Sequence, residues 1–345
     1  MAAGVFDTKS KLSAMDDYTE LYIQMKPEEL VLLKNLKRSY PGMKAPKSWK
    51  RTNELLGREA KSYSAVSEGT DKAKTWRFKQ NGIIESQLEV AHSDGYAITR
   101  EAIVLNGGRV QEDTLKRLIA QDGSDFMRSI EHVLGSAQEC VPKTATDTVT
   151  RTRGLMNWLQ TTAHDALDVP ADLRPVAELK LVGDAVLTEA LFKEQLLKAR
   201  KAAGHMLYLT GFVGIDAKLA FADFLQRVQT VAGFDKTLSR GVDYRETEVF
   251  SSVDFLKYDM ANVKLLCLDG LDCDTTTLEP GQYSGHSGAF IEPENFQVEF
   301  AEPVTHEDLT SKLDLGSGRK GFHHAMFRLN CTGLLGSFRM QRVAS

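Results

Sequence analysis

Cysteine is scarce in this chain. Its four cysteines, Cys140, Cys267, Cys273 and Cys331, are spread over 345 residues, and none forms a CxxC pair. Four cysteines in so long a chain do not make a disulfide framework. We therefore expect free thiols, mostly buried.

Long hydrophobic runs are missing as well. The longest uncharged stretch, 202–215, is interrupted by three glycines, a histidine and a threonine. It falls short of the ~20 apolar residues that cross a bilayer. The first twenty residues also lack the apolar centre of a secretory signal. These absences predict a protein without a membrane span that stays in the cytoplasm where it is made.

An excess of positive charge is the third absence. The formal net charge is -4, which argues against a protein that coats nucleic acid over its whole surface. Hydrophobic residues make up 42% and charged residues 26% of the chain, the usual range for a folded protein with a core. The length allows two or three domains, or one large elaborated domain.

A hydrolase motif is only partly present. Residues 284–289, SGHSGA, resemble the Gly-x-Ser-x-Gly turn of a nucleophile elbow. The last glycine is replaced by Ala289, and Glu292-Pro293-Glu294 follows where a helix should begin. We interpret this segment as a glycine-rich surface loop.

Metal and phosphate motifs also fail. His323 and His324 are adjacent on an alternating segment, so they should point to opposite faces of a strand and cannot chelate one metal together. The acids in 269–274 lack the spacing of a calcium loop. Asn106-Gly107-Gly108 is followed by acid where a phosphate loop needs Gly-Lys. We expect no metal, no cofactor and no enzymatic activity.

The sequence does contain a basic, aromatic stretch from Lys44 to Lys79. It has ten lysines and arginines against four acids, so the rest of the chain is strongly acidic. Lys74 to Phe78 alternates, and Asn81-Gly82 and Asp94-Gly95 predict hairpin turns. With so few apolar residues, this β excursion needs a partner to lie on. The candidate subunit-contact residues are Lys50, Arg51, Arg58, Lys61, Lys72, Lys74, Arg77 and Lys79.

Nucleic acid is an alternative partner for this stretch, since aromatic and basic residues together can bind single strands. The acidic remainder favours contact between copies of the chain, because opposite charges steer association.

A long amphipathic helix is predicted from about Val110 to Gln138. Apolar residues recur there every three or four positions, and the helix would be roughly 40 Å long. Gly123 in its interior costs ~1 kcal/mol against alanine. Before it, 1–26 reads as an extended arm without a core, and a helix starts at Pro27 and stops by Tyr40.

The middle and end of the chain mix helices and strands. Thr188 is predicted to cap a helix through Ala203, with Gly204 ending it. A buried strand follows at 206–213, Asp216 caps a helix to about Val228, and short strands lie in 249–268. Alternating segments at 296–300, 325–331 and 338–343 predict late strands. The fold class is α+β.

Two segments resemble the major capsid proteins of tailed bacteriophages, whose fold is shared with encapsulins and the herpesvirus capsid floor. GGRVQEDTLKRLIAQDGSDFMRSIEHVL (107–134) is similar to the spine helix of that family, and RGLMNWLQTTAHDALDVPADLRP (153–175) to the entry of its axial domain. The resemblance implies an N-terminal arm and short helix (1–45), an extended β loop (46–104), a spine helix of the peripheral domain (105–140), an axial domain (141–274) and C-terminal strands returning to the peripheral domain (275–345).

The resemblance also implies a function. The chain would assemble into pentamers and hexamers of an icosahedral virion capsid, enclosing double-stranded DNA without sequence-specific contact. Its partners would be itself, a portal, and separate scaffolding or cement proteins. The alternatives are an encapsulin-like compartment, a hydrolase using Ser287 and a histidine, and a nucleic-acid-binding protein acting through 44–79.

Overall fold

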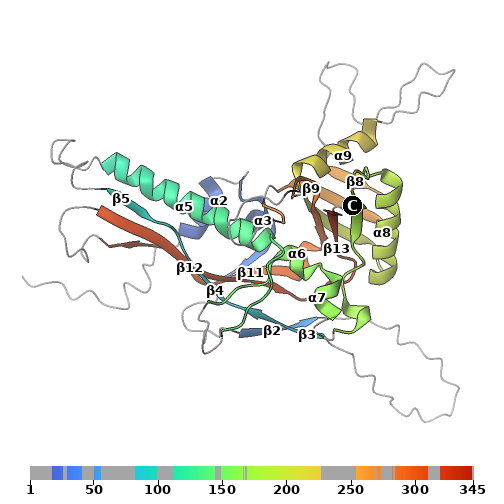
Figure 1. Ribbon diagram of the computed structural model, residues 1–345, viewed down its shortest axis with the longest axis horizontal. Helices are drawn as coiled ribbons and strands as arrows, with labels where there is room; N and C mark the ends of the chain where they lie inside the picture. The colour runs from blue at the N-terminus through green and yellow to red at the C-terminus, as the bar shows by residue number, and fades with distance from the viewer. Residues whose placement is uncertain are drawn as a thin grey trace, which may run out of the picture.

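The molecule is elongated, with one β-sheet at each end (Figure 1). The computed structural model describes residues 18–25, 29–40, 50–55, 82–98, 112–143, 149–165, 167, 169–226, 254–268, 270–272, 282, 284–309 and 319–343.

The first sheet is built on a long antiparallel pair and lies under a long helix. Its strands run in the order β1 (Lys37–Ser39), β11 (Phe296–Asp308), β12 (Arg319–Cys331) and β4 (Glu89–His92), with β5 (Tyr96–Ile98) also pairing with β12. The helix, α5 (Glu112–Gly135), lies along this sheet (Figure 1). Both the predicted helix and the predicted strands at 296–300 and 325–331 are confirmed.

The apolar stripe of α5 forms the first core. Phe126, Met127 and Ile130 are at most 5% exposed and pack with Phe300 and Phe327 from the sheet. Burying side chains of this size stabilises the fold by roughly 1.5–3 kcal/mol each. The short helices α6 (Leu155–Trp158), α7 (Thr161–Asp165) and η1 (Ala171–Leu173) follow, and the fully buried Trp158 joins the same core.

The second sheet has six strands and its own core. The order is β6 (Leu179–Val182), β13 (Phe338–Val343), β10 (Gly288–Ile291), β7 (Leu207–Val213), β9 (Ala261–Cys267) and β8 (Phe255–Lys257). Helices α8 (Glu189–Ala203) and α9 (Ile215–Gln226) cover it. A cluster of aromatic rings fills the core between them: Phe192, Phe221, Phe290 and Phe338.

The helix α8 has the predicted ends. Thr188 is its N-cap, with Oγ1 accepting from the Leu191 N–H, and Gly204 ends it in the left-handed conformation at φ 76°. In α9 the predicted start was two residues too late: the helix starts at Ile215, so Asp216 lies in its first turn rather than at the cap. An acid there still complements the helix dipole.

The C-terminal strands divide between the two sheets. Strands β10 and β13 lie in the six-stranded sheet, so residues 275–345 divide between both sheets and do not all return to the first. Residues 155–173 pack in the first core, so the second core begins with Leu179 and not near 141. Both β10 and β13 carry a phenylalanine that fits the second aromatic cluster, which explains their position. The 3-10 turns η2 (Ser284–His286) and η3 (Pro293–Asn295) flank β10.

The N-terminal expectations were partly wrong. Residues 18–25 form a helix, α2 (Tyr18–Met25), whose Tyr22 and Ile23 are buried in the first core. The next helix is short, α3 (Val31–Asn35), and 37–39 then form β1, parallel to β11. Residues 37–39 pair with one edge of β11. This tertiary pairing outweighs the helical tendency of their sequence.

The predicted hairpin at Asp94-Gly95 is absent. Strands β4 and β5 do not pair with each other, and both pair with β12 along one edge. Gly95, at φ 77°, makes the bend between them, where a Cβ would lie 2.6 Å from the Gly321 carbonyl oxygen. Gly82, predicted in a turn, instead starts a strand, β3 (Gly82–Gln87), while Asn81 lies outside the described residues.

Candidate assembly surface

One strand of a paired ribbon lies within the basic stretch, and the other strand follows it. Strand β2 (Lys50–Leu55) is antiparallel to β3, with Lys50 opposite Gln87 and Leu55 opposite Gly82. This ribbon runs along the lower edge of the molecule in Figure 1. It holds together the two ends of the segment 56–81, which lies outside the described residues. This ribbon is therefore the root of the β excursion, and it belongs to the first lobe, the part of the molecule built around the first sheet.

A buried ionic network fixes that root to the long strands. Glu299 of β11, 5% exposed, accepts hydrogen bonds from Arg51 of the ribbon, from Arg328 of β12 (2.5 Å) and from Asn330 (2.8 Å). Burial alone would raise the pKa of Glu299, but the two guanidinium groups and the Asn330 amide outweigh it and lower this pKa. The carboxylate is thus held charged between its partners.

A second chain of hydrogen bonds joins the ribbon to β12. The Ser86 hydroxyl donates to Asn330 Oδ1 (2.8 Å) and accepts from Asn53 Nδ2 (2.9 Å). All three side chains are at most 4% exposed. Because buried polar groups are costly to leave without partners, this chain fixes one register for the ribbon.

Of the eight candidate contact residues, the structure describes two. Lys50 forms an ion pair with Glu85 across the ribbon, and Arg51 pairs with Glu299. Arg58, Lys61, Lys72, Lys74, Arg77 and Lys79 lie outside the described residues. Both described residues therefore have partners in their own chain, and contact with another subunit stays a prediction.

Glu299, Arg328 and Asn330 were not among the predicted site residues. Each stands at a polar position of an alternating strand, between buried Val, Phe, Leu or Cys neighbours. In the β11–β12 register Glu299 is directly opposite Arg328. Opposite charges at the polar positions of two long alternating segments are the signal that could have revealed this pair.

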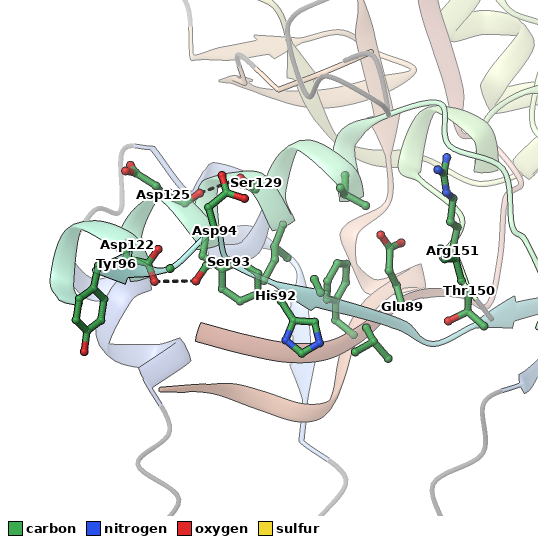
Figure 2. A pocket seen from close by; sticks show the side chains of 18 of the residues that line it. Glu89, His92, Ser93, Asp94, Tyr96, Asp122, Asp125, Ser129, Thr150 and Arg151 are labelled. Carbon is green, nitrogen blue, oxygen red and sulfur yellow. Dashed lines mark hydrogen bonds between the residues drawn. The ribbon is translucent and has the colours of Figure 1, made fainter. Parts of the chain in front are cut away.

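A groove of about 690 Å³ lies between α5 and the edge strands β4 and β5 (Figure 2). Its floor is apolar and includes Phe126, Ile130 and Phe327. Asp94, Asp122 and Asp125 lie at one end, whereas Arg151 lies toward the other, near Glu89 (Figure 2). Four carboxylates against one guanidinium make the groove an acidic surface. Burial raises the pKa of Glu89, although hydrogen bonds from Thr152 and Gln138 oppose the shift.

One wall of the groove is fixed by a cluster around Asp122. Its Oδ2 accepts from the Ser93 hydroxyl (2.7 Å) and lies 2.6 Å from Nδ1 of the buried His323. Nε2 of His323 is 3.0 Å from the Tyr22 hydroxyl. The cluster joins α2, α5 and β12 to the bend before β5.

This Ser-His-Asp set lacks the geometry of a nucleophilic triad. The Ser93 hydroxyl points at Asp122, and the group beside His323 Nε2 is the phenol of Tyr22. Burial raises the pKa of Tyr22 to about 12, so this phenol stays protonated and is not activated. We assign the cluster a positioning role.

The loop around Ser287 is not a nucleophile elbow either. Residues 284–286 form a 3-10 turn that leads into strand β10, whereas an elbow leads from a strand into a helix. The fully buried Ser287 has its hydroxyl 3.4 Å from Asp272, and His286 lies beside Asp216 and Arg342. The expected surface loop is therefore partly buried.

The remaining sequence predictions concern the adjacent histidines, metal sites and membrane spans. His323 is fully buried, whereas its neighbour His324 faces Thr305 and Glu302, so the two point apart as predicted. Among the residues that the structure describes, no three His, Cys, Asp or Glu side chains gather as a metal site. None of the described helices is long and apolar enough to span a bilayer.

Several solved structures have a similar fold. The capsid of the native GTA particle has a TM-score of 0.53 and 9% identity, covering 92% of this chain and 91% of that one. The capsid of cyanophage P-SCSP1u has a TM-score of 0.53 and 11% identity, covering 90% of this chain and 86% of that one. The structure from Gordonia phage Cozz has a TM-score of 0.53 and 11% identity, covering 91% of this chain and 87% of that one. Two lobes, a long helix and the β2–β3 ribbon thus belong to a fold that this chain shares with these structures.

The sequence itself identifies the family. The family model of the SU10 major capsid protein matches residues 5–318, and the chain belongs to that family. It is a major capsid protein, as the resemblance predicted. No curated protein matches the chain.

Proposed function

We propose that this major capsid protein forms pentamers and hexamers that close into an icosahedral shell around double-stranded DNA. It acts as a structural subunit and not as an enzyme, is assembled in the host cytoplasm, and meets a portal and separate scaffolding or cement proteins. It touches the DNA without reading its sequence. Family membership favours this reading over an encapsulin-like compartment.

The lobes have distinct roles in this proposal. The first sheet with α5 as spine helix is the peripheral domain, and the six-stranded sheet with α8 and α9 is the axial domain that meets its copies around the capsomer axis. The basic segment 56–81 reaches a neighbouring subunit, with Arg58, Lys61, Lys72, Lys74, Arg77 and Lys79 as contact residues. Lys50 and Arg51 hold its root within the chain.

The observation that carries the proposal is the fixed root of this basic segment. A loop that only covered its own subunit would not need a paired ribbon held by a buried ionic network. A loop that must meet a neighbour at a set place benefits from a rigid root, because rigidity lowers the entropy lost on association.

Negative-stain electron microscopy of the purified chain tests the proposed geometry. We expect rings of five and six subunits, and closed shells when a scaffold or crowding agent is added. Only irregular aggregates, or only compact single particles, would contradict assembly through pentamers and hexamers.

A further inference from the structure

Half of the eight histidines of the chain lie in the first sheet, toward the end where β5 pairs with β12: His92, His306, His323 and His324. Two of them, His306 of β11 and His323 of β12, are directly opposite in register, and their ring centroids are 5.1 Å apart. We propose that this imidazole pair is an acid-sensitive switch, which holds helix α2 on the sheet at neutral pH and releases it when His306 takes up a proton. The switch belongs to the single subunit and does not depend on how subunits assemble.

His323 joins α2 to the sheet. It is fully buried, and its Nδ1 lies 2.6 Å from Oδ2 of Asp122 on α5. Its Nε2 lies 3.0 Å from the Tyr22 hydroxyl, which also has the Ile119 carbonyl oxygen at 3.5 Å. This hydroxyl can therefore donate to a neutral imidazole or accept from a charged one. Both protonation states of His323 have partners while α2 is docked.

His306 is in a less favourable place for a charge. Its Nε2 lies 3.0 Å from the Tyr96 hydroxyl, and the two rings stack. Burial and the adjacent His323 lower the pKa of His306 below its ordinary value of 6.5, although Asp308 and Asp122 oppose this shift. The docked state thus favours the neutral form of His306.

A proton on His306 would add a positive charge beside a ring that already has its counter-charge. The ionisable side chains around the pair are Tyr18 and Tyr22 of α2, Asp122 of α5, Tyr96 of β5, Asp308 of β11 and Arg319 of β12. Two of these are carboxylates, and Asp122 already accepts from His323 and Ser93. Release of α2 would let water reach both imidazoles, so the opened form holds the additional proton more easily. Docking is therefore strongest above about pH 6.5 and weakens as the pH falls below it.

Helix α2 is the element that gives way in this proposal. It has eight residues, and isolated helices shorter than ~12 residues are marginal in water, so its helical form depends on docking. The rings of Tyr18 and Tyr22 both pack edge-on against His323, and the Thr19 hydroxyl accepts from the Val304 N–H. Because α2 is not part of either sheet, it can leave without breaking a strand pair.

Hydrogen exchange followed by mass spectrometry tests the switch on the unassembled full-length chain, separated by size exclusion. From pH 7.5 to pH 5.0 we expect the protection factors of the α2 amides, corrected for the intrinsic exchange rate, to fall roughly fivefold or more. Amides 126–133 of α5 should keep their protection. That comparison separates release of α2 from acid unfolding of the first lobe.

Three variants assign the effect. His306→Gln removes the titrating ring and should abolish the fall. The matched control, His92→Gln, changes an exposed histidine on the opposite face of the same sheet and should keep the fall of the wild type. Asp308→Asn removes an exposed acid that favours the charged form of His306, so the loss of protection should move to lower pH.

Unchanged protection of α2 in the wild type would overturn the switch, as would an equal fall in His306→Gln or an equal loss in α5. Should His306→Gln fail to dock α2 at pH 7.5, Asp308→Asn decides. A midpoint below that of the wild type supports the switch, and a midpoint at or above it overturns the assignment to His306.

Discussion

At the scale of single residues, Gly123 has a packing role that the pattern of its own helix does not reveal. It was expected to weaken α5 slightly, but a Cβ at this position would lie 2.1 Å from the Tyr22 ring. The glycine lets α2 pack closely on α5, with Tyr22 reaching His323 behind it. The pattern of one helix could not show this, because the reason for the glycine lies about a hundred residues away.

Gly123→Ala should therefore destabilise the protein, opposite to the ~1 kcal/mol gain normal for a helix interior. Overpacking against Tyr22 costs about 1–3 kcal/mol, so we expect the thermal midpoint to fall by several degrees. Differential scanning calorimetry measures this. In a Tyr22→Ala background the same change should be neutral or stabilising; a rise in the wild-type background would contradict the close contact.

Glu131 predicts a pH dependence. It is 1% exposed, its carboxyl oxygens accept from the Leu32 and Leu33 N–H groups, and burial raises its pKa to about 7 against those bonds. Because the folded state holds this proton more tightly than the unfolded chain, its contribution is full below about pH 4.5 and is lost as the pH rises through 7.

Glu131→Gln should remove that dependence. Between pH 5 and pH 8 the wild-type free energy of unfolding should fall by on the order of 2 kcal/mol more than that of the variant. Urea unfolding at the two pH values gives both numbers. Parallel pH profiles for the two proteins would show that Glu131 does not titrate in this way.

At the scale of elements, the predictable parts are those whose pattern is set within one segment. The stripe from Leu115 to Val133 specifies α5, Thr188 and Gly204 specify both ends of α8, and alternation specifies β11 to β13. The mistaken parts depend on a distant partner: β1 exists because β11 offers an edge, and β4 and β5 follow β12 instead of forming a hairpin.

The same limit applies to the assembly surface. The basic stretch was visible as composition, but the role of Arg51 depends on Glu299, 248 positions later. The groove could not be predicted, since its walls come from α5, from the edge strands and from residues 149–151. Such sites are set by tertiary contacts.

Two neighbouring residues of the ribbon allow a matched comparison. Arg51→Ala removes a partner of the buried Glu299 and should cost about 1–2 kcal/mol. Lys50→Ala removes an ion pair between half-exposed side chains and should cost less than ~1 kcal/mol. We expect the thermal midpoint to fall more for Arg51→Ala, and proteases to cut its loop faster. Equal effects of the two changes would mean that the ionic network does not fix the root.

The loop itself can be removed without its root. Replacing 57–80 by a short glycine-serine turn keeps β2 and β3 paired, so the subunit should fold with a nearly unchanged thermal midpoint. It should nevertheless fail to close shells, because the reaching segment is gone. Normal shells by electron microscopy from this well-folded variant would refute the role of the loop.

At the scale of the whole molecule, two cores and a projecting ribbon suit a subunit that fits slightly different positions in one shell. Each lobe has its own buried cluster, and the long β11–β12 pair and the strands β10 and β13 carry the chain between them. Contact between copies is then left to the surfaces outside these cores.

The most direct test of self-assembly is the molar mass of the purified chain, measured by light scattering over a range of concentrations. The account predicts a mass that rises steeply to that of rings and shells, and sooner when a crowding agent is added. A mass equal to one chain at every concentration, with and without the crowding agent, would contradict it.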